Sequence, residues 1–201
     1  MIGETADRLA RQVAFIAEVD RLKTVLRNTR LTDGSRAENS AEHSWHLALM
    51  AVLLAEHAPP DVDISHAVRL LLVHDIVEID AGDTDCYDAD GYATKAAREQ
   101  SAAARLFGLL PPEQAAEFRA LWEEFEACST AEAQYANALD RLQPMLLVRH
   151  VTHRDWSLRA TTREQVLQRM APVEHGAPGL WPIVTGIIEE AFTTGRTGRI
   201  D

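Results

Sequence analysis

The sequence has few cysteines and no long apolar runs. Its two cysteines, Cys86 and Cys128, are far apart, so neither a disulfide framework nor a thiolate metal site is indicated. No stretch approaches the ~20 uncharged apolar residues of a membrane-spanning helix. The first residues, Met1 to Thr5, lack the basic start and apolar run of a signal peptide. These absences predict a cytoplasmic protein with no membrane partner.

Positive charge is also scarce. The chain has 20 Lys and Arg against 31 Asp and Glu, a formal net charge of −11. Such a surface repels a polyphosphate backbone, so we expect no nucleic-acid polymer as partner. A small phosphorylated molecule remains compatible, because one cation and a few arginines can reverse the potential locally.

Alternating strand patterns, internal repeats and low-complexity segments are missing, whereas helical patterns recur along the chain. Because 46% of its 201 residues are apolar, the chain can bury a core. We therefore predict an all-α bundle of about seven or eight helices in a single domain, residues 1–201. The expected helices cover about 5–27, 39–54, 63 or 65 to 79, a segment after 91 to 107, a segment from 111 onward, 129–148, 163–170 and 181–193.

Several of these helices have predicted faces or ends. Apolar residues lie at helical spacing in the first helix, namely Leu9, Val13, Ile16, Val19 and Leu22. Residues 28–38 should form a loop. Asn39 with Glu42 resembles a capping box, and the following helix is apolar nearly all round, which predicts a central, buried position. Gly82 should end the helix that precedes it. The stripe containing Leu121, Trp122 and Phe125 should be core. Ser129 with Glu132 forms a second capping-box pattern.

The doublet His74-Asp75 ends a strongly apolar segment, where an uncompensated Asp would be costly to bury. A divalent cation shared with distant ligands removes that cost. Imidazole and carboxylate together suit zinc, manganese, cobalt, nickel or iron better than calcium. Glu78 follows at helical spacing, where its carboxylate can accept a proton from a cation-bound water whose pKa is lowered. Asp83 projects from the next turn toward the same place.

Two further segments contain candidate ligands. His43 lies in the first turn of its helix within Glu42-His43-Ser44-Trp45-His46, and His46, one turn along, is expected to be a core or boundary residue. Asp140 lies in Ala138-Leu139-Asp140-Arg141-Leu142, an otherwise buried-looking helix. The neighbour Arg141 cannot face Asp140 as a helical pair, because consecutive residues point in different directions.

Together these segments resemble the HD-domain phosphohydrolase superfamily, whose ligand order is His, His-Asp, Asp. The resemblance extends from Leu22-Lys23 through Leu142, and it is greatest to the 5′-deoxynucleotidase branch. It implies that His43, His74, Asp75 and Asp140 bind one divalent cation, which could be Mn, Co, Zn, Ni, Fe or Mg. It also implies that Glu78 assists the attacking water and that Asp83 contacts the substrate near its sugar.

The same resemblance implies an arginine upstream of the first histidine that binds phosphate. Arg27 in Leu22-Lys23-Thr24-Val25-Leu26-Arg27 aligns best, with Arg30 and Arg36 as alternatives. An aromatic residue follows this arginine in the bacterial nucleotidases, whereas Asn28 follows it here. Lys95 is another candidate phosphate contact.

We therefore predict a metal-dependent phosphomonoesterase of the 5′-nucleotidase type, which removes phosphate from nucleoside 5′-monophosphates or similar small esters by attack of metal-bound water. One alternative is a nucleotide pyrophosphohydrolase, for which more cationic residues would be expected. A di-iron oxygenase is disfavoured because no histidine lies between His74 and His150. The non-enzyme alternative is a helical binding protein in which the cation has only a structural role and stabilises the fold. Relatives form homodimers, so a homodimer is expected, and the segment with Trp181, Ile187 and Phe192 is either its interface or core.

Overall fold

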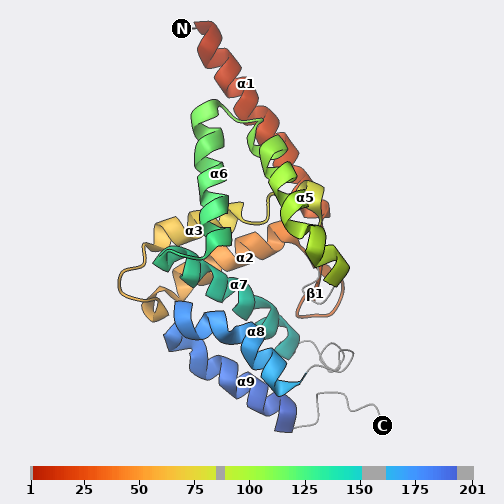
Figure 1. Ribbon diagram of the computed structural model, residues 1–201, viewed down its shortest axis with the longest axis vertical. Coiled ribbons are helices and arrows are strands. Elements are labelled where there is room, and N and C mark those ends of the chain that lie inside the picture. The colour runs from red at the N-terminus through yellow and green to blue at the C-terminus, as the bar shows by residue number, and fades with distance from the viewer. Residues whose placement is uncertain (1, 85–88, 151–161, 194–201) are drawn as a thin grey trace.

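The computed structural model describes residues 2–84, 89–150 and 162–193 (Figure 1). Within them, the longer elements are α1 (Ile2–Val19), α2 (Ser40–Leu53), α3 (Ile64–Val73), α4 (Glu78–Ala81), α5 (Ala89–Phe107), α6 (Pro112–Ala127), α7 (Ala131–His150), α8 (Arg163–Gly176) and α9 (Trp181–Thr193). They are joined by the 3-10 helices η1 (Asp20–Thr24), η2 (Ala55–His57) and η3 (Pro178–Leu180) and by the strands β1 (Leu26–Arg30) and β2 (Ala37–Asn39). This confirms the predicted all-α class. In the described part of the chain, no helix combines the length and apolar character needed to cross a membrane.

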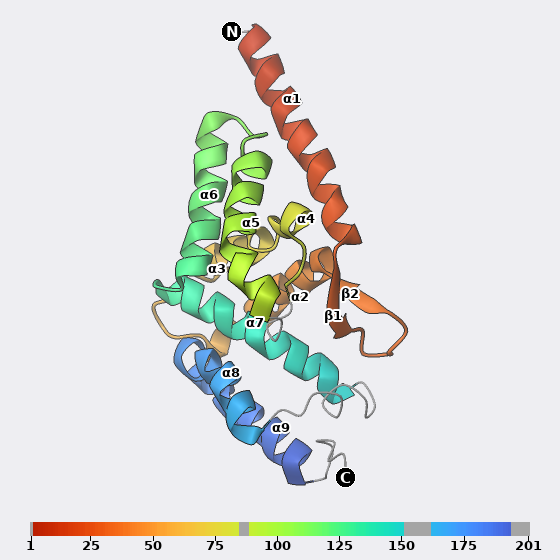
Figure 2. The ribbon, with the colours of Figure 1, turned by 45° about the vertical axis from the view of Figure 1, so that its right-hand side comes forward.

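The helices form two groups on either side of a central layer. Helices α2, α3 and α7 lie in the middle of the molecule (Figures 1 and 2). Helices α5 and α6 run side by side above them with α1, whose Phe15 ring meets the Phe118 ring edge-on at 5.4 Å. Helices α8 and α9 cover the opposite side of α7. The central layer therefore has helices on both sides, and its side chains are the most deeply buried.

The core lies where these groups meet. Leu47, Leu70 and Leu139, from α2, α3 and α7, are fully buried, as is Tyr135, whose hydroxyl donates to the carbonyl of Ala51 at 3.3 Å. The predicted stripe of α6 is confirmed, since Leu121, Trp122 and Phe125 are all buried. Burying such side chains stabilises the fold by roughly 1.5–3 kcal/mol each.

The segment before α2 differs from the prediction. The first helix ends earlier, with η1 after Val19, and residues expected to form helix end and loop form the antiparallel hairpin β1–β2. Gly34, at φ +69°, makes the turn, and its amide donates to the carbonyl of Leu31. The alternation in β1 is weak because its residues are mostly polar, so periodicity alone could not reveal the strand.

The segment around the His-Asp doublet also differs. The expected continuous helix to about residue 79 breaks after Val73, and a turn over 74–77 leads into α4. In this turn, backbone hydrogen bonds from residue i to residue i−3 replace the i to i−4 bonds of an α-helix. One example is the bond from the amide of Glu78 to the carbonyl of Asp75 at 2.9 Å. Of the two predicted N-caps of α3, Asp63 and Ser65, the structure has Asp63. Gly82, at φ +74°, ends α4 as expected.

Two apolar faces are exposed over part of their length. Of the apolar residues at helical spacing in the first segment, Leu9, Val13 and Ile16 are exposed, whereas Leu22 is buried in η1 and Val19 packs against the core. Phe15, which lies outside this pattern, is the buried residue of α1. Helix α2 is not buried all round, because an apolar stripe on it faces outward. This stripe, called the α2 stripe below, consists of Trp45, Leu49, Val52 and Leu53. Local sequence shows that a face is apolar but not whether another element reaches it.

Three smaller predictions are settled by side-chain contacts and burial. The capping box at Asn39 and Glu42 is confirmed. At α7 the cap is Thr130 rather than Ser129, because the Thr130 hydroxyl accepts from the amide of Ala133. In the last helix Ile187 is buried, and Trp181 and Phe192 pack against the core. Of the two options for these residues, core is therefore correct. Cys86 lies outside the described residues.

Candidate metal centre

The break between α3 and α4 brings adjacent side chains to one place. His74 Nε2 and Asp75 Oδ1 lie 3.0 Å apart. His74 Nδ1 lies 2.8 Å from the carbonyl oxygen of Leu71, which can only accept, so Nδ1 must carry the proton. Nε2 then has a free lone pair that faces the carboxylate. Burial lowers the pKa of His74, against the attraction of Asp75 and Asp140, which favours this neutral form.

His43 and Asp140 are the other two candidate donors. His43, fully buried in the first turn of α2, places Nε2 3.0 Å from Asp140 Oδ1 on α7. Burial and the charge of Arg27 would lower the pKa of His43, but the hydrogen bond to Asp140 and the nearby carboxylates of Glu38 and Asp75 raise it to about 9. Burial would raise the pKa of Asp140, yet His43 holds it well below its usual range.

These side chains fit a divalent cation. Ligand atoms of His43, His74 and Asp75 all lie within 4.8 Å of one another, with Asp140 beside His43. His74 Nε2 is buried and has no hydrogen-bond partner among the described residues. A lone pair facing a carboxylate oxygen at 3.0 Å is unfavourable unless a positive charge lies between them. Two imidazoles and two carboxylates are the donor set of a transition metal.

Arg27 is the predicted phosphate-binding arginine that reaches this cluster. Its Nη1 donates to Asp75 Oδ2 at 2.9 Å, and the side chain is 14% exposed. Burial acts to lower the pKa of Arg27, but the carboxylates led by Asp75 raise it, so the guanidinium stays charged. The alternatives are engaged elsewhere, since Arg30 donates to the carbonyl of Gly34 and Arg36 to Glu42.

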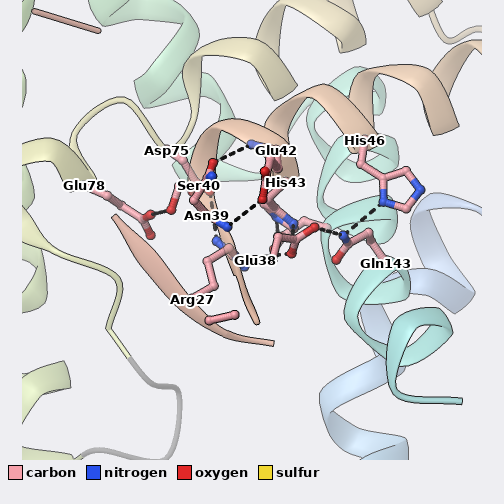
Figure 3. A network of polar contacts seen from close by, with 12 residues as sticks. Arg27, Glu38, Asn39, Ser40, Glu42, His43, His46, Asp75, Glu78 and Gln143 are labelled. Atoms are coloured by element: carbon pink, nitrogen blue, oxygen red, sulfur yellow. Dashed lines mark hydrogen bonds and ion pairs between the residues drawn. The ribbon is translucent and has the colours of Figure 1, made fainter. Parts of the chain in front are cut away.

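Glu78 lies at the edge of the same cluster. It is buried in the first turn of α4, and its Oε2 accepts from the hydroxyl of Ser40 at 2.6 Å (Figure 3). Burial and the nearby Asp75 raise the pKa of Glu78 well above its ordinary value, although Arg27 and Ser40 oppose this. A carboxyl group with a raised pKa can accept and release a proton near neutral pH.

Asp83 and Lys95 lie farther out. Asp83 follows Gly82 and is half-buried, and its charge acts on Arg27 and Glu78. Lys95, on α5, contacts Glu99 at 2.7 Å and lies 3.9 Å from Glu126 of α6. Burial raises the pKa of Glu126, and Asp75 and Asp140 raise it further, so this carboxyl group is within electrostatic reach of the centre.

Three polar residues of the site were not found from the sequence. Ser40 holds Glu78, while Glu38 and Gln143 are hydrogen-bonded to each other at 2.6 Å and lie behind His43 (Figure 3). All three are buried polar residues. The signal available was their position, since Glu38 and Ser40 flank the Asn39 cap and Gln143 follows Asp140 by three residues. His46 contacts Gln143 at 3.2 Å, in agreement with its predicted boundary role.

Comparison with known proteins places this geometry in a family. The HD-domain family model matches residues 19–181. The chain is 32% identical over 136 residues to the 5′-deoxynucleotidase HDDC2 of Homo sapiens, covering 68% of this chain and 63% of the relative. It is 34% identical over 137 residues to the HDDC2 of Bos taurus, covering 68% and 62%. The chain thus spans less than two thirds of the length of these two relatives.

A solved structure covers nearly the whole chain. It is a predicted metal-dependent phosphohydrolase from Magnetospirillum magnetotacticum MS-1, with a TM-score of 0.92 and 50% sequence identity, covering 99% of this chain and 100% of that one. The fold and the order of the site residues define a helical protein with a His/His-Asp/Asp centre. This chain belongs to the HD-domain family.

Proposed function

We propose that this protein is a divalent-metal-dependent phosphohydrolase that removes the phosphate of nucleoside 5′-monophosphates or similar small esters. The observation that carries the proposal is the contact of Arg27 with Asp75 at 2.9 Å, because it puts a buried guanidinium beside the candidate cation site. The names of the relatives, 5′-deoxynucleotidase and predicted metal-dependent phosphohydrolase, support the same chemistry.

In this proposal His43, His74, Asp75 and Asp140 hold one cation such as Mn, Co, Zn, Ni, Fe or Mg. When bound, such a cation supplies Lewis acidity toward phosphoryl oxygen and lowers the pKa of a coordinated water. Arg27 balances negative charge on the phosphoryl oxygens, as a planar guanidinium suits. Glu78, held by Ser40, takes the proton of the attacking water.

The electrostatics of the centre favour a single phosphate. Four buried or nearly buried carboxylates, those of Glu38, Asp75, Glu78 and Asp140, surround one guanidinium. Lys95, the other candidate phosphate contact, is held by Glu99. A chain of several phosphates would need more positive charge than this arrangement offers. We therefore prefer a monophosphate ester over a nucleoside triphosphate, and we propose that Asp83 contacts the sugar.

The test is a screen of nucleoside mono-, di- and triphosphates with several divalent metals, measuring released phosphate and pyrophosphate. We expect phosphate from monophosphates, and loss of both bound cation and hydrolysis in His74→Ala, Asp75→Ala and Asp140→Ala. Rapid release of pyrophosphate with monophosphates untouched would favour the pyrophosphohydrolase. Tight cation binding without any hydrolysis would favour the non-enzyme alternative, a binding protein with a structural cation. Unchanged metal content in all three variants would refute the ligand assignment.

We further propose a homodimer formed through the α2 stripe. Its four side chains lie at helical spacing, from Trp45 with 63% exposure to Leu53 with 71%. A two-fold interface pairs a patch with its own copy, so an uncharged apolar stripe is self-complementary even in a chain of net charge −11. The cytoplasmic location and the single domain over residues 1–201 stay predictions.

A further inference from the structure

A buried carboxylate behind the candidate metal centre has no role in the function proposed so far. Glu38, on β2, is 2% exposed. Its Oε1 accepts from Gln143 Nε2 at 2.6 Å, which fixes the orientation of the carboxylate. Its Oε2 points the other way, toward His43 Nδ1 at 3.6 Å and Arg27 Nε at 3.9 Å (Figure 3).

The three facing atoms are complementary in charge, but they lie at ion-pair distances without forming a hydrogen bond. Glu38 Oε2, His43 Nδ1 and Arg27 Nε are all buried, and none has a hydrogen-bond partner among the described residues. One is an acceptor, and an N–H at each of the other two is a donor. Buried polar groups are nearly always paired, and these separations exceed the usual upper limit of ~3.2 Å by about 0.4 Å for His43 and about 0.7 Å for Arg27. Small side-chain adjustments would let Oε2 accept from both.

We infer that Glu38 is a positioning residue that orients His43 toward the cation and Arg27 toward the phosphate through one shared carboxylate oxygen. This inference rests on the proposed function and deepens it. A proton held on His43 Nδ1 leaves the lone pair on Nε2, which faces Asp140 and the other donors. A fixed Nε holds the guanidinium plane, so that Nη1 reaches Asp75.

Two alternative roles are distinguishable. Glu38 is not placed as a ligand, because it lies on the Nδ1 side of the imidazole, away from Asp140 and outside the group of His43, His74 and Asp75. A purely structural role would rest on its hydrogen bond to Gln143. If the role were purely structural, any carboxylate–amide pair at positions 38 and 143 that keeps this hydrogen bond should preserve cation binding, whichever of the two residues carries the charge.

The experiment compares Glu38→Gln with the double variant Glu38→Gln/Gln143→Glu. The double variant keeps a carboxylate–amide pair but moves the negative charge away from His43. The control is Glu124→Gln, which removes a carboxylate that contacts another imidazole, His66, at 2.9 Å. The readouts are Mn²⁺ affinity by chelator competition, the His43 tautomer by ¹⁵N NMR, the unfolding midpoint, and kcat and KM. The tautomer is read in the metal-free protein at a pH of ~10, because His43, with a pKa of about 9, is neutral only above that pKa.

We expect Glu38→Gln to weaken Mn²⁺ binding by about 10–100-fold, the usual effect of losing the partner behind a ligating histidine. The Nδ1-protonated tautomer of His43 should decrease and KM should rise. The double variant should recover the unfolding midpoint of the wild type but not its Mn²⁺ affinity. The control Glu124→Gln should change neither the midpoint nor the Mn²⁺ affinity. Wild-type affinity and tautomer in Glu38→Gln, or recovery of both in the double variant, would overturn the inference.

Failure of the two proposals can be told apart. Cation affinity and tautomer are measured without substrate, so a protein that binds Mn²⁺ but hydrolyses no phosphate ester would contradict only the proposed function. Conversely, normal affinity in Glu38→Gln together with active wild-type enzyme would contradict only the role of Glu38. If Glu38→Gln does not fold, the double variant still decides between the positioning and structural roles.

Discussion

At the scale of single residues, the direction in which a side chain leaves the backbone decides which of several similar residues reaches the site. Arg27 and Arg30 are three residues apart on β1, so they point to opposite faces of the strand. Arg27 is largely buried beside Asp75, and Arg30 is exposed. The sequence grouped both with Arg36 because residue type alone carries no direction, and the strand that separates them was not predicted.

Arg27→Ala should therefore raise KM for a monophosphate by about tenfold or more, because a hydrogen bond to a charged group contributes ~1.5–3 kcal/mol. Arg30→Ala is the matched control on the same strand, and its KM should stay at the wild-type value. Steady-state kinetics with both variants checks this. An equal effect of the two substitutions would remove Arg27 from the phosphate site.

Glu78→Ala separates cation binding from proton transfer. Its carboxylate is held by Ser40 rather than by the donors around the cation, so the variant should keep the bound metal and the fold. Its kcat should fall by ~10²–10⁴, the usual contribution of a positioned general base. Metal analysis and kcat are compared with Glu56→Ala, an exposed control. Near-normal kcat would assign proton transfer to another group, with Asp83 the next candidate.

At the scale of elements, helix content and most helix ends were readable from the sequence, whereas the cap of α7, the helix break and the helix partners were not. Asn39, Asp63 and Gly82 mark ends correctly because each acts on backbone groups of its own helix. The break after Val73 has no such local signal. It places His74 and Asp75 in a turn, which brings both side chains to the cation site although they are adjacent.

The contact between α8 and α7 depends on a residue without a side chain. A Cβ on Gly176 would overlap the backbone carbonyl of Gln134 and lie 3.1 Å from the amide nitrogen of Tyr135. Gly176→Ala should therefore lower the free energy of unfolding by ~1–3 kcal/mol. Gly186→Ala, in α9, meets nothing within 4 Å and should be neutral or stabilising by about 0.5–1 kcal/mol. Urea unfolding of both variants checks this, and equal midpoints would contradict it.

At the scale of the whole molecule, the apolar residues that stay exposed are as informative as the core. Their exposure could not be predicted, because it depends on which distant helices reach each face.

If the α2 stripe pairs two copies, Leu53→Glu should convert a dimer to a monomer in light-scattering mass measurements, since it would bury two unpaired charges. Ile16→Glu, at an equally exposed apolar position of α1, is the control. A monomeric wild-type protein would refute the dimer, and dissociation by Ile16→Glu alone would move its interface to α1.

The candidate ligands are separated widely in the chain, with His43 on α2, His74 and Asp75 after α3, and Asp140 on α7. An unfolded chain cannot present them together, so the cation and the native state are thermodynamically linked by mass action. At a free cation concentration of 100 times Kd, this linkage adds ~2.7 kcal/mol to the stability of the fold. The unfolding midpoint should therefore climb with Mn²⁺ concentration in the wild type and stay level in His74→Ala. On this view the ion proposed to serve hydrolysis would also influence how much of the protein is folded when metal is scarce.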